Sequence, residues 1–348
     1  MANGKSVVAA NAGRSKTIAL QFPPNRRQMT KTIPNVALVV PTLNGGSLWR
    51  TWLEKFAEQS IRPARLLIID SSSEDDTVPL AHAAGFEVIT IARRDFDHGG
   101  SRQHGFNLVE PAEFVIFMTQ DAILANSNSL ELLVNSIGKP EIGAVYGRQL
   151  PRPTADCIEA HARLFNYPET GHSRSIADAP RLGIRAAFLS NSFAVYRRVA
   201  LEQIGGFPSR LIFGEDAYVA TRMLAKGWQI AYCADAPVYH SHAYSWLEYF
   251  RRYFDVGVLH ARERWIGELV GGSGGEGVRF VKSELRFLSR NAPLQIPRGL
   301  SYIAAKLFGY NLGLNEDKLP NWAKLRMSLN RNFWEQDVET VITKKPLA

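Results

Sequence analysis

The chain has 348 residues, of which 45% are hydrophobic and 21% are charged. This size and composition favour a globular α/β protein of enzyme size, with one large core or two modest ones. The formal net charge of +8 suits an acidic partner, but charge alone does not choose among nucleotide phosphates, nucleic acid and an anionic membrane face.

Composition also bears on the compartment. The chain has only two cysteines, Cys157 and Cys233, without a CxxC pair or a zinc-finger spacing, which indicates a reducing compartment. The N-terminal residues are polar and basic and lack the apolar core of a secretory signal. No run reaches the ~18 to 20 apolar residues that a membrane-spanning helix needs. We therefore expect a cytoplasmic protein that at most lies peripherally on the inner face of the cell membrane.

Three segments are predicted along the chain. Residues 1–33 mix Asn, Gly, Ser, Lys and Arg, as is typical of a flexible leader. Residues 34–265 are predicted to form the main domain. Residues 266–348 are predicted to form a helical C-terminal extension, with the glycine-rich stretch 271–277 as a linker.

The main domain opens with short apolar runs that alternate with helical patterns. Apolar residues at helical spacing predict a helix over 48–56. The predicted strands of the first half span 36–40, 66–69, 86–91 and 114–118. This alternation predicts an α/β fold with a mainly parallel central sheet flanked by helices. Beyond about residue 140 the pattern becomes mixed, with a strand predicted over 187–196 and a helix over 216–226.

Polar side chains follow the predicted strands at the points where the strands end. They are Thr42, Asn44, Asp70, Gln120 and Asp121. Ligands of such sheets bind outside the carboxyl ends of the strands, so these residues are candidates for substrate contacts. Asp70 suits a hydrogen bond to a nucleobase or ribose, but it equally suits a turn.

Three residues are candidate metal ligands. Asp121 follows a buried strand, where a carboxylate can hold Mg²⁺ or Mn²⁺ against a diphosphate, although it could instead cap the following helix. His240 and His242 follow a predicted strand at 236–239, and either imidazole could complete the metal site or contact the diphosphate.

Two further sites combine charge with a helix start. Glu215 and Asp216 open a predicted helix, where one carboxylate could accept a proton from an attacking hydroxyl; helix capping is the alternative. Arg102 lies where a glycine-rich turn meets a helix start, so it could bind an anion, or it could be an ordinary surface arginine.

Taken in order, these motifs resemble the family 2 glycosyltransferases of the GT-A fold, over about residues 35–260. The motifs are Val39-Val-Pro-Thr-Leu-Asn44, Leu67-Ile-Ile-Asp-Ser-Ser-Ser73, Thr119-Gln-Asp-Ala122 and Gly214-Glu-Asp216. The resemblance implies that Asp70 contacts the nucleoside, that Asp121 binds the metal as the last acid of a DxD-type motif, and that Asp216 is the base.

Thr-Gln-Asp-Ala is also similar to the bacterial rhamnosyltransferase branch, together with the segments 96–102 and 239–245. That branch implies inverting transfer of L-rhamnose from dTDP-L-rhamnose to a glycan or lipid-linked saccharide in cell-surface polysaccharide synthesis. We expect Thr42 to help hold the nucleoside, and Arg102 and a histidine to share the diphosphate charge. Glu215, Ser190 and Asn191 are expected on the acceptor side.

Other readings stay open at this level. The donor could instead be a UDP- or GDP-sugar. A nucleotidylyltransferase would normally carry a glycine-rich basic loop after the first strand, which Pro41-Thr-Leu-Asn44 lacks. A non-enzymatic carbohydrate- or nucleic-acid-binding role leaves the acidic motifs unexplained, and we expect no nucleic acid as partner. The aromatic, basic C-terminal part could touch an anionic membrane, pack on the main domain or mediate dimerisation.

Overall fold

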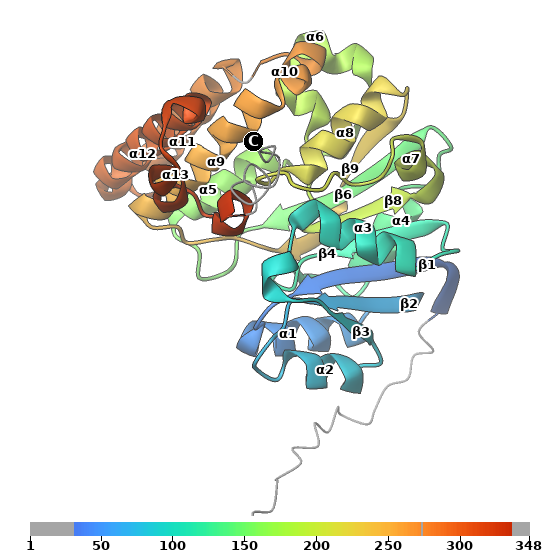
Figure 1. Ribbon diagram of the computed structural model, residues 1–348. Helices are drawn as coiled ribbons and strands as arrows, with labels where there is room; N and C mark the ends of the chain where they lie inside the picture. Colours follow the sequence, from blue (N-terminus) through green and yellow to red (C-terminus); the bar gives the residue numbers. More distant parts are fainter. Residues whose placement is uncertain (1–30, 273, 336–348) are drawn as a thin grey trace, which may run out of the picture.

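The computed structural model describes residues 31–272 and 274–335 (Figure 1). It contains a nine-stranded sheet whose main path runs β3-β2-β1-β4-β8-β6-β9-β5, with β7 paired to β9. Helices cover both faces of this sheet, which confirms the predicted α/β class with a mainly parallel sheet. Residues 1–30 of the expected leader lie outside the described residues, and its last three residues belong to strand β1.

The first half forms a parallel sheet. Its strands are β1 (Lys31–Thr42), β2 (Ile61–Asp70), β3 (Glu87–Thr90) and β4 (Phe114–Met118). The connecting helices are α1 (Gly46–Ala57), α2 (Thr77–Ala83) and α3 (His98–Leu108). β1 lies between β2 and β4, and all these pairs are parallel, so the polar residues that follow β1, β2 and β4 share one edge.

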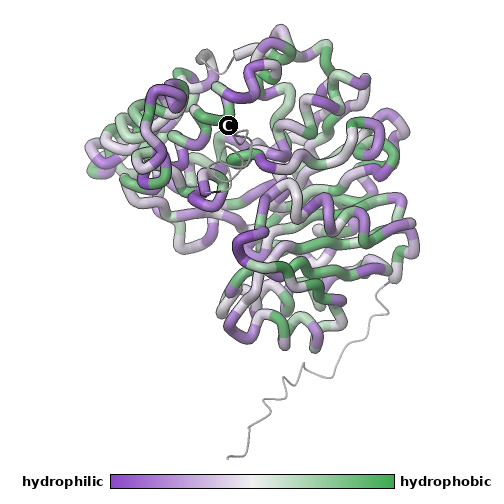
Figure 2. Tube along the Cα trace, in the orientation of Figure 1, coloured by the Kyte–Doolittle hydropathy of each residue, from purple (hydrophilic) through white to green (hydrophobic). Residues whose placement is uncertain are grey.

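Side chains alternate between two cores along these strands. Val39 and Leu67 point into one core, which α3 covers, whereas Leu38 and Ile68 point into the other, which α1 and α2 cover. Successive residues of a strand face opposite sides of the sheet, so near-continuous apolar runs are needed to fill both cores. These strands accordingly form continuous hydrophobic bands through the middle of the molecule (Figure 2).

The second half completes the same sheet with strands of both directions. They are β5 (Ile123–Leu124), β6 (Ile142–Leu150), β7 (His172–Arg174), β8 (Phe193–Arg197) and β9 (Gln229–Tyr239). β8 runs antiparallel to both β4 and β6, and β6 pairs parallel with β9. The strand predicted over 187–196 is shorter than expected: a 3₁₀ turn (Gly183–Ala187) ends at residue 187, residues 188–192 form a loop, and β8 begins at Phe193.

Short helices connect these strands. They are α4 (Ser129–Asn135), α5 (Cys157–Asn166), α6 (Ala179–Leu182), α7 (Arg198–Gln203) and α8 (Glu215–Ala225). Short 3₁₀ turns also occur at Arg93–Asp95 and Ile176–Asp178. The helix predicted over 216–226 is α8, which begins one residue earlier.

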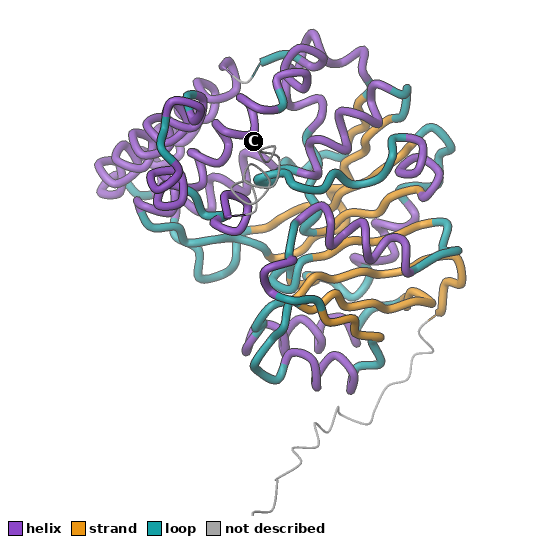
Figure 3. The backbone as a smooth tube through the Cα atoms, in the orientation of Figure 1, coloured by secondary structure: helices purple, strands orange, loops and turns teal. Residues whose placement is uncertain are grey.

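The chain ends in a helical cluster on the side away from β1–β3 (Figure 3). It comprises α9 (Trp246–Arg262), α10 (Arg264–Val270), α11 (Gly274–Asn291), α12 (Ile296–Leu314) and α13 (Asn321–Met327), with 3₁₀ turns at Pro293–Gln295 and Glu316–Lys318. The glycine-rich linker is shorter than predicted, because Gly274–Gly277 form the first turn of α11. α10 spans the predicted boundary at residues 265 and 266. In the described part of the chain, none of the helices combines the length and the hydropathy that a bilayer-spanning segment needs.

Candidate active site

Strand β9 brings together three segments that lie far apart in the sequence. Its last residue, Tyr239, pairs with Leu150 of β6 on one side and with Ile123 of β5 on the other. His240 follows Tyr239, and its backbone N–H donates a hydrogen bond to the carbonyl of Leu150 at 3.0 Å. The residues just before β5 and just after β6 therefore flank the histidines that follow β9.

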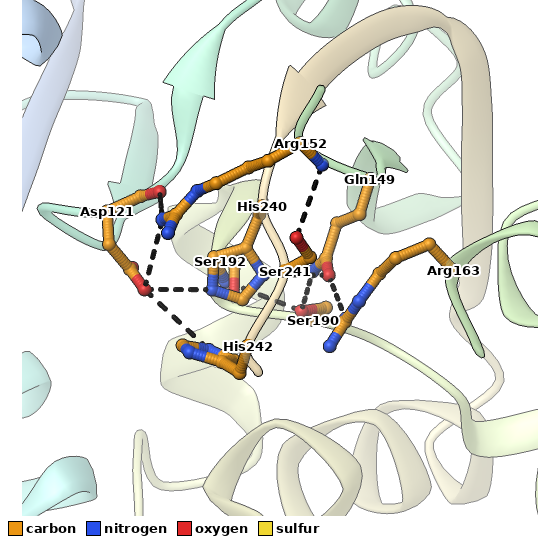
Figure 4. A network of polar contacts seen from close by, with 9 residues as sticks. All are labelled: Asp121, Gln149, Arg152, Arg163, Ser190, Ser192, His240, Ser241 and His242. Carbon is orange, nitrogen blue, oxygen red and sulfur yellow. Dashed lines mark hydrogen bonds and ion pairs between the residues drawn. The ribbon is translucent and has the colours of Figure 1, made fainter. Parts of the chain in front are cut away.

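Asp121, His240 and His242 form a cluster at this junction (Figure 4). Asp121 Oδ2 lies 3.3 Å from His240 Nε2 and 3.6 Å from His242 Nε2. One potential ligand atom from each residue lies within 4.8 Å of the others, so a single ion can contact all three. The structure thus brings together the three residues that the sequence nominated as metal ligands.

Gln149, at the end of β6, fixes the orientation of His240. Its side-chain oxygen contacts His240 Nδ1 at 2.9 Å and accepts a hydrogen bond from Arg163. A guanidinium can only donate, so the Gln149 atom between the two groups is an acceptor and His240 Nδ1 carries the proton. His240 Nε2 is then the ring nitrogen that faces Asp121, and it is the nitrogen that a metal would take.

Electrostatics keep the cluster in a form that can bind a cation. Burial opposes the charge of Asp121, but the hydrogen bond from His240 and the nearby imidazoles hold the pKa of this carboxyl well below its usual value. Burial and the neighbouring His240 lower the pKa of His242 to about 4. At neutral pH the cluster therefore offers an ionised carboxylate and, from His242, a neutral imidazole.

Sequence reasoning missed Arg152. It donates a hydrogen bond to the backbone carbonyl of Asp121 at 2.8 Å, and its guanidinium lies 3.9 Å from Asp121 Oδ2. A polar residue near the end of a strand is the signal that identified the other candidates, and Gln149 and Arg152 carry the same signal at the end of β6. It was overlooked because β6 lies in the part of the chain where the pattern of strands and helices becomes mixed.

The second carboxylate site lies at the start of α8. Glu215 is buried and ion-paired with Arg102 at 2.9 Å, and it accepts a hydrogen bond from the Asn191 side chain at 2.9 Å. Burial opposes the charge of Glu215, but Arg102, the nearby His98 and the hydrogen bond from Asn191 together outweigh it and lower the pKa of this carboxyl. For Asp216, burial and the adjacent Glu215 charge raise the pKa to about 7. Glu215 is thus held ionised, while the pKa of Asp216 lies close to neutral pH, as a general base requires.

Residues 190–192 join the two acidic sites. Ser190 Oγ accepts a hydrogen bond from the Gln149 amide at 2.8 Å, and the backbone N–H of Asn191 donates to Asp216 Oδ2 at 3.4 Å. The Asn191 side chain is buried between Glu215 and Tyr196, whose hydroxyl donates to it at 2.6 Å. These contacts link the His240 side of the site to the candidate base.

This arrangement changes several expected roles. Arg102 is buried and donates to the carbonyl of His98 as well as pairing with Glu215, so it does not face a diphosphate. Glu215 and Asn191 are likewise buried and face each other rather than an acceptor. The reason is that a buried charge needs a partner, and these side chains supply one another with partners inside the fold.

The expected nucleoside residues hold two loops together. Asp70 is fully buried and accepts hydrogen bonds from Thr42 Oγ1 at 2.9 Å and from Ser73 Oγ at 2.6 Å. Asn44 is exposed and accepts from the backbone N–H of Glu74 at 2.8 Å. The loops after β1 and β2 are therefore joined by hydrogen bonds. Asp70 supports them from inside instead of facing a nucleoside.

Gln120 adds a third segment to this pair of loops. Its side-chain amide donates to the carbonyl of Leu43 and accepts from the Leu43 N–H, each at 2.9 Å. This two-way contact fixes the loop after β1 against the residue that precedes Asp121. Gln120 therefore positions the loop and is not oriented towards a substrate.

A polar pocket of about 320 Å³ opens beside the cluster. Its lining includes Arg152, Ser241 and His242, together with Glu159 and Tyr244, and the ring of Tyr244 stacks on that of His242. Carboxylate, guanidinium and aromatic side chains around one pocket suit a hydroxyl-rich or charged ligand.

The chemistry of the donor set fits a divalent cation. An ionised carboxylate and two imidazoles, one oriented by Gln149, are ligands that proteins use for first-row divalent metals. Mg²⁺ strongly prefers oxygen ligands, whereas an imidazole nitrogen is a softer donor. Asp121, His240 and His242 are therefore a donor set that fits a divalent cation.

Solved structures with a similar fold define the class first. The chain superposes on a mannosyltransferase, PcManGT from Pyrobaculum calidifontis in complex with GDP-Man and Mn²⁺, with a TM-score of 0.51 and 17% identity, covering 90% of this chain and 88% of that one. It also superposes on residues 1–349 of TarS from S. aureus, with a TM-score of 0.50 and 15% identity, covering 88% and 92%. These matches show the GT-A-like fold.

The sequence comparisons then give the family. A model described as glycosyltransferase like family 2 matches residues 34–255, and the chain belongs to this family of glycosyltransferases. It is 46% identical over 300 residues to the O-antigen chain rhamnosyltransferase RfbN of Salmonella typhimurium, covering 86% of this chain and 96% of RfbN. It is 45% identical over 303 residues to the O-antigen chain rhamnosyltransferase WbaN of Salmonella anatum, covering 87% and 96%.

Proposed function

We propose that this glycosyltransferase moves L-rhamnose from dTDP-L-rhamnose to a hydroxyl of a saccharide acceptor during the synthesis of a bacterial surface polysaccharide. The observation that carries the proposal is the similarity to two O-antigen chain rhamnosyltransferases along nearly their whole length. The cluster beside strand β9 supports the same reading, because a divalent cation and a nearby base are what transfer from a nucleotide-sugar requires.

In this proposal the donor lies along the edge formed by the strand ends. The hydrogen-bonded loops after β1 and β2 hold the nucleoside. Thr42 and Asp70 support these loops from inside, and Asn44 lies at their exposed edge. Asp121, His240 and His242 hold Mn²⁺ or Mg²⁺, which neutralises charge on the diphosphate when bound. Arg152 takes the diphosphate role that the sequence assigned to Arg102, because its guanidinium lies at the cluster and is partly exposed.

Asp216 is the proposed base. It removes the proton from the acceptor hydroxyl while that oxygen forms a bond to the anomeric carbon. The bond between that carbon and the diphosphate oxygen breaks on the opposite face, so the configuration inverts and dTDP leaves. Arg102 and Glu215 are positioning residues here, since they hold the start of α8 and set the charge beside Asp216. As part of the proposal, the protein works peripherally at an anionic membrane face.

A donor screen tests the proposal. The purified protein is mixed with dTDP-rhamnose, UDP-sugars or GDP-sugars and with Mn²⁺ or Mg²⁺. Binding is read by calorimetry and slow hydrolysis by nucleotide release, which needs no known acceptor. We expect metal-dependent binding and turnover of dTDP-rhamnose, stronger with Mn²⁺.

Two variants separate the roles in this screen. Asp121→Ala should lose metal-dependent binding of the nucleotide, whereas Asp216→Asn should bind the donor normally and lose turnover. Preference for a UDP- or GDP-sugar would keep the mechanism and overturn the rhamnosyl assignment. Normal metal-dependent binding by Asp121→Ala would instead overturn the metal site.

A further inference from the structure

Helix α12 exposes an apolar face to solvent. Leu300, Leu307 and Phe308 are 49%, 57% and 61% exposed. From residue 300 to residue 311 every exposed position of α12 is uncharged: Leu300, Ser301, Ala304, Leu307, Phe308 and Asn311. The opposite side of α12 packs on α9, where Gly309 and Gly313 meet the α9 backbone. A helix whose exposed side carries no charge over three turns normally has an apolar environment to meet.

Trp246 extends this face from the neighbouring helix α9. It is 45% exposed, and its ring nitrogen donates a hydrogen bond to the carbonyl of Ser301 at 3.0 Å. Its ring stacks on Phe250, which lies 5.9 Å from the ring of Phe308. The apolar face therefore comprises Trp246, Leu300, Ala304, Leu307 and Phe308. A tryptophan at the edge of such a face is typical of contact with a membrane interface.

Helix α11 exposes basic side chains next to α12. Arg279, Lys282, Arg286 and Arg290 occur at helical spacing on its exposed side, and we call them the basic stripe. Beyond its first turn the only acid of α11 is Glu284, which is fully buried and faces Lys306 of α12 at 3.9 Å. No carboxylate on the outer side of α11 therefore neutralises Lys282, Arg286 or Arg290.

The apolar face also lies close to the polar pocket beside the metal cluster. Tyr244 and Glu248 line that pocket, and Trp246 lies between them in the sequence. Ser245 and Glu248 hold this turn through reciprocal capping hydrogen bonds at the start of α9. One ordered turn of chain thus contributes side chains to both the pocket and the apolar face.

We propose that the apolar face of α12 and the basic stripe of α11 form a docking surface for an anionic lipid bilayer. Apolar side chains enter the headgroup boundary, while the lysine and arginines attract anionic lipid headgroups. A second copy of the chain fits less well, because it would bring one basic stripe near another. Docking in this way holds the pocket beside the membrane, where a lipid-linked saccharide acceptor would reach it; this last step rests on the proposed function.

The structure also revises which residues carry membrane contact. Leu288 and Ile303, which belong to the C-terminal part that the sequence suggested for membrane contact, are buried. Phe308 and Trp322 are exposed, as that interpretation requires. The pattern could not separate them, because hydrophobic residues occur on both the packed and the exposed sides of α12.

Vesicle flotation with the full-length protein tests the docking surface. Vesicles of phosphatidylcholine alone are compared with vesicles that also contain phosphatidylglycerol, at low and at physiological salt. We expect binding only to the anionic vesicles, weaker at higher salt. Leu307→Glu with Phe308→Glu should reduce it at least tenfold, and so should Arg286→Glu with Arg290→Glu. Leu300→Glu is an independent single variant with the same expected direction.

Matched controls carry the same changes elsewhere. Val199→Glu places a charge on an exposed apolar position of α7, and Lys139→Glu with Lys226→Glu reverses two exposed charges on the main domain. Both controls should bind vesicles as the parent protein does. Absence of parent binding to anionic vesicles would overturn the proposal. So would a parent dimer in sedimentation analysis that the Leu307→Glu, Phe308→Glu variant dissociates.

Donor hydrolysis in solution keeps the two proposals apart. The docking variants should hydrolyse dTDP-rhamnose at the parent rate, because their changes lie on the outer side of the C-terminal helices. Vesicle binding without any such hydrolysis in the parent would leave the docking surface standing and remove the rhamnosyl assignment. Equal vesicle binding by the parent and the Leu307→Glu, Phe308→Glu variant would remove the docking surface alone.

Discussion

The side-chain oxygen of Gln149 accepts a hydrogen bond from His240 Nδ1 at 2.9 Å. Arg163 donates to the same oxygen, and the Gln149 amide nitrogen donates to Ser190. This glutamine therefore sets which nitrogen of His240 is free to face Asp121. It also ties that imidazole to the segment that contacts Asp216.

Gln149→Leu should weaken Mn²⁺ binding. Loss of an outer hydrogen-bond partner of a metal-ligating histidine typically costs ~10- to 100-fold in metal affinity. Gln149→Glu is the control variant: it keeps an acceptor for both His240 and Arg163, while it loses the amide donor to Ser190 and adds a negative charge. Titration of Mn²⁺ in the presence of dTDP measures both. Equal affinity in the Leu variant and the parent would remove the orienting role.

Asp216→Asn should lose about 10² to 10⁴ of the transfer rate, which is what a general base typically contributes. The amide cannot accept the proton from the acceptor hydroxyl. Its one oxygen can keep the hydrogen bond from Ala217, while the longer one from Asn191 to the other carboxylate oxygen is lost. Single-turnover transfer to an acceptor, or donor hydrolysis in its place, gives the rate. Full activity in this variant contradicts the assignment of the base.

The rate should rise with pH through about 7, the value to which burial and Glu215 raise the pKa of Asp216. Below that pH the carboxyl is protonated in the folded protein and cannot act as a base; above it the base is ionised. A profile of kcat/KM against pH for the free enzyme measures the midpoint. A flat profile between pH 5 and pH 8 would contradict this prediction.

Glu215→Gln should move this midpoint to lower pH. The substitution removes the negative charge that opposes ionisation of Asp216, and it leaves the positive charge of Arg102 to favour ionisation. Breaking the buried Arg102 pair should also destabilise the fold, by about 3 to 5 kcal/mol. Thermal melting therefore accompanies the pH profile, which is measured well below the melting temperature. An unmoved midpoint would show that Glu215 does not set the pKa of Asp216.

Gly313→Ala should destabilise the protein although alanine is the better helix former. A Cβ at this position would lie 2.1 Å from the carbonyl oxygen of Phe254, because α12 and α9 pack backbone to backbone. Overpacking of this kind costs about 1 to 3 kcal/mol. Chemical unfolding measures the change in free energy.

Gly267→Ala is the control for helix propensity. Gly267 lies within α10, and nothing lies within 4 Å of the position that its Cβ would occupy. This variant should be more stable than the parent, by up to about 1 kcal/mol. The same sign for both glycine variants would contradict close packing of α12 on α9.

Much of the fold could be predicted from local pattern. The runs at 36–40, 66–69 and 114–118 are strands because each has apolar residues for two cores, and periodicity alone reports this. The pattern predicts a strand from residue 187, whereas β8 begins at Phe193, because the apolar composition of residues 187–189 is the same in a strand and in a buried loop. Pattern could not show that β8 reverses direction between β4 and β6.

The residue types alone point to the proposed chemistry, because Asp121, His240, His242 and Asp216 are the kinds of side chain that a metal-assisted transfer uses. Which side chains face a ligand and which face each other could be seen only in the folded chain. Arg102 and Glu215 are residue types that often bind substrates, yet here they form an ion pair with each other inside the fold. Two side chains can form an ion pair or share a ligand only when the fold brings their segments close together. The strand register that places Leu150 and Ile123 beside Tyr239 is one example, and local sequence does not encode it.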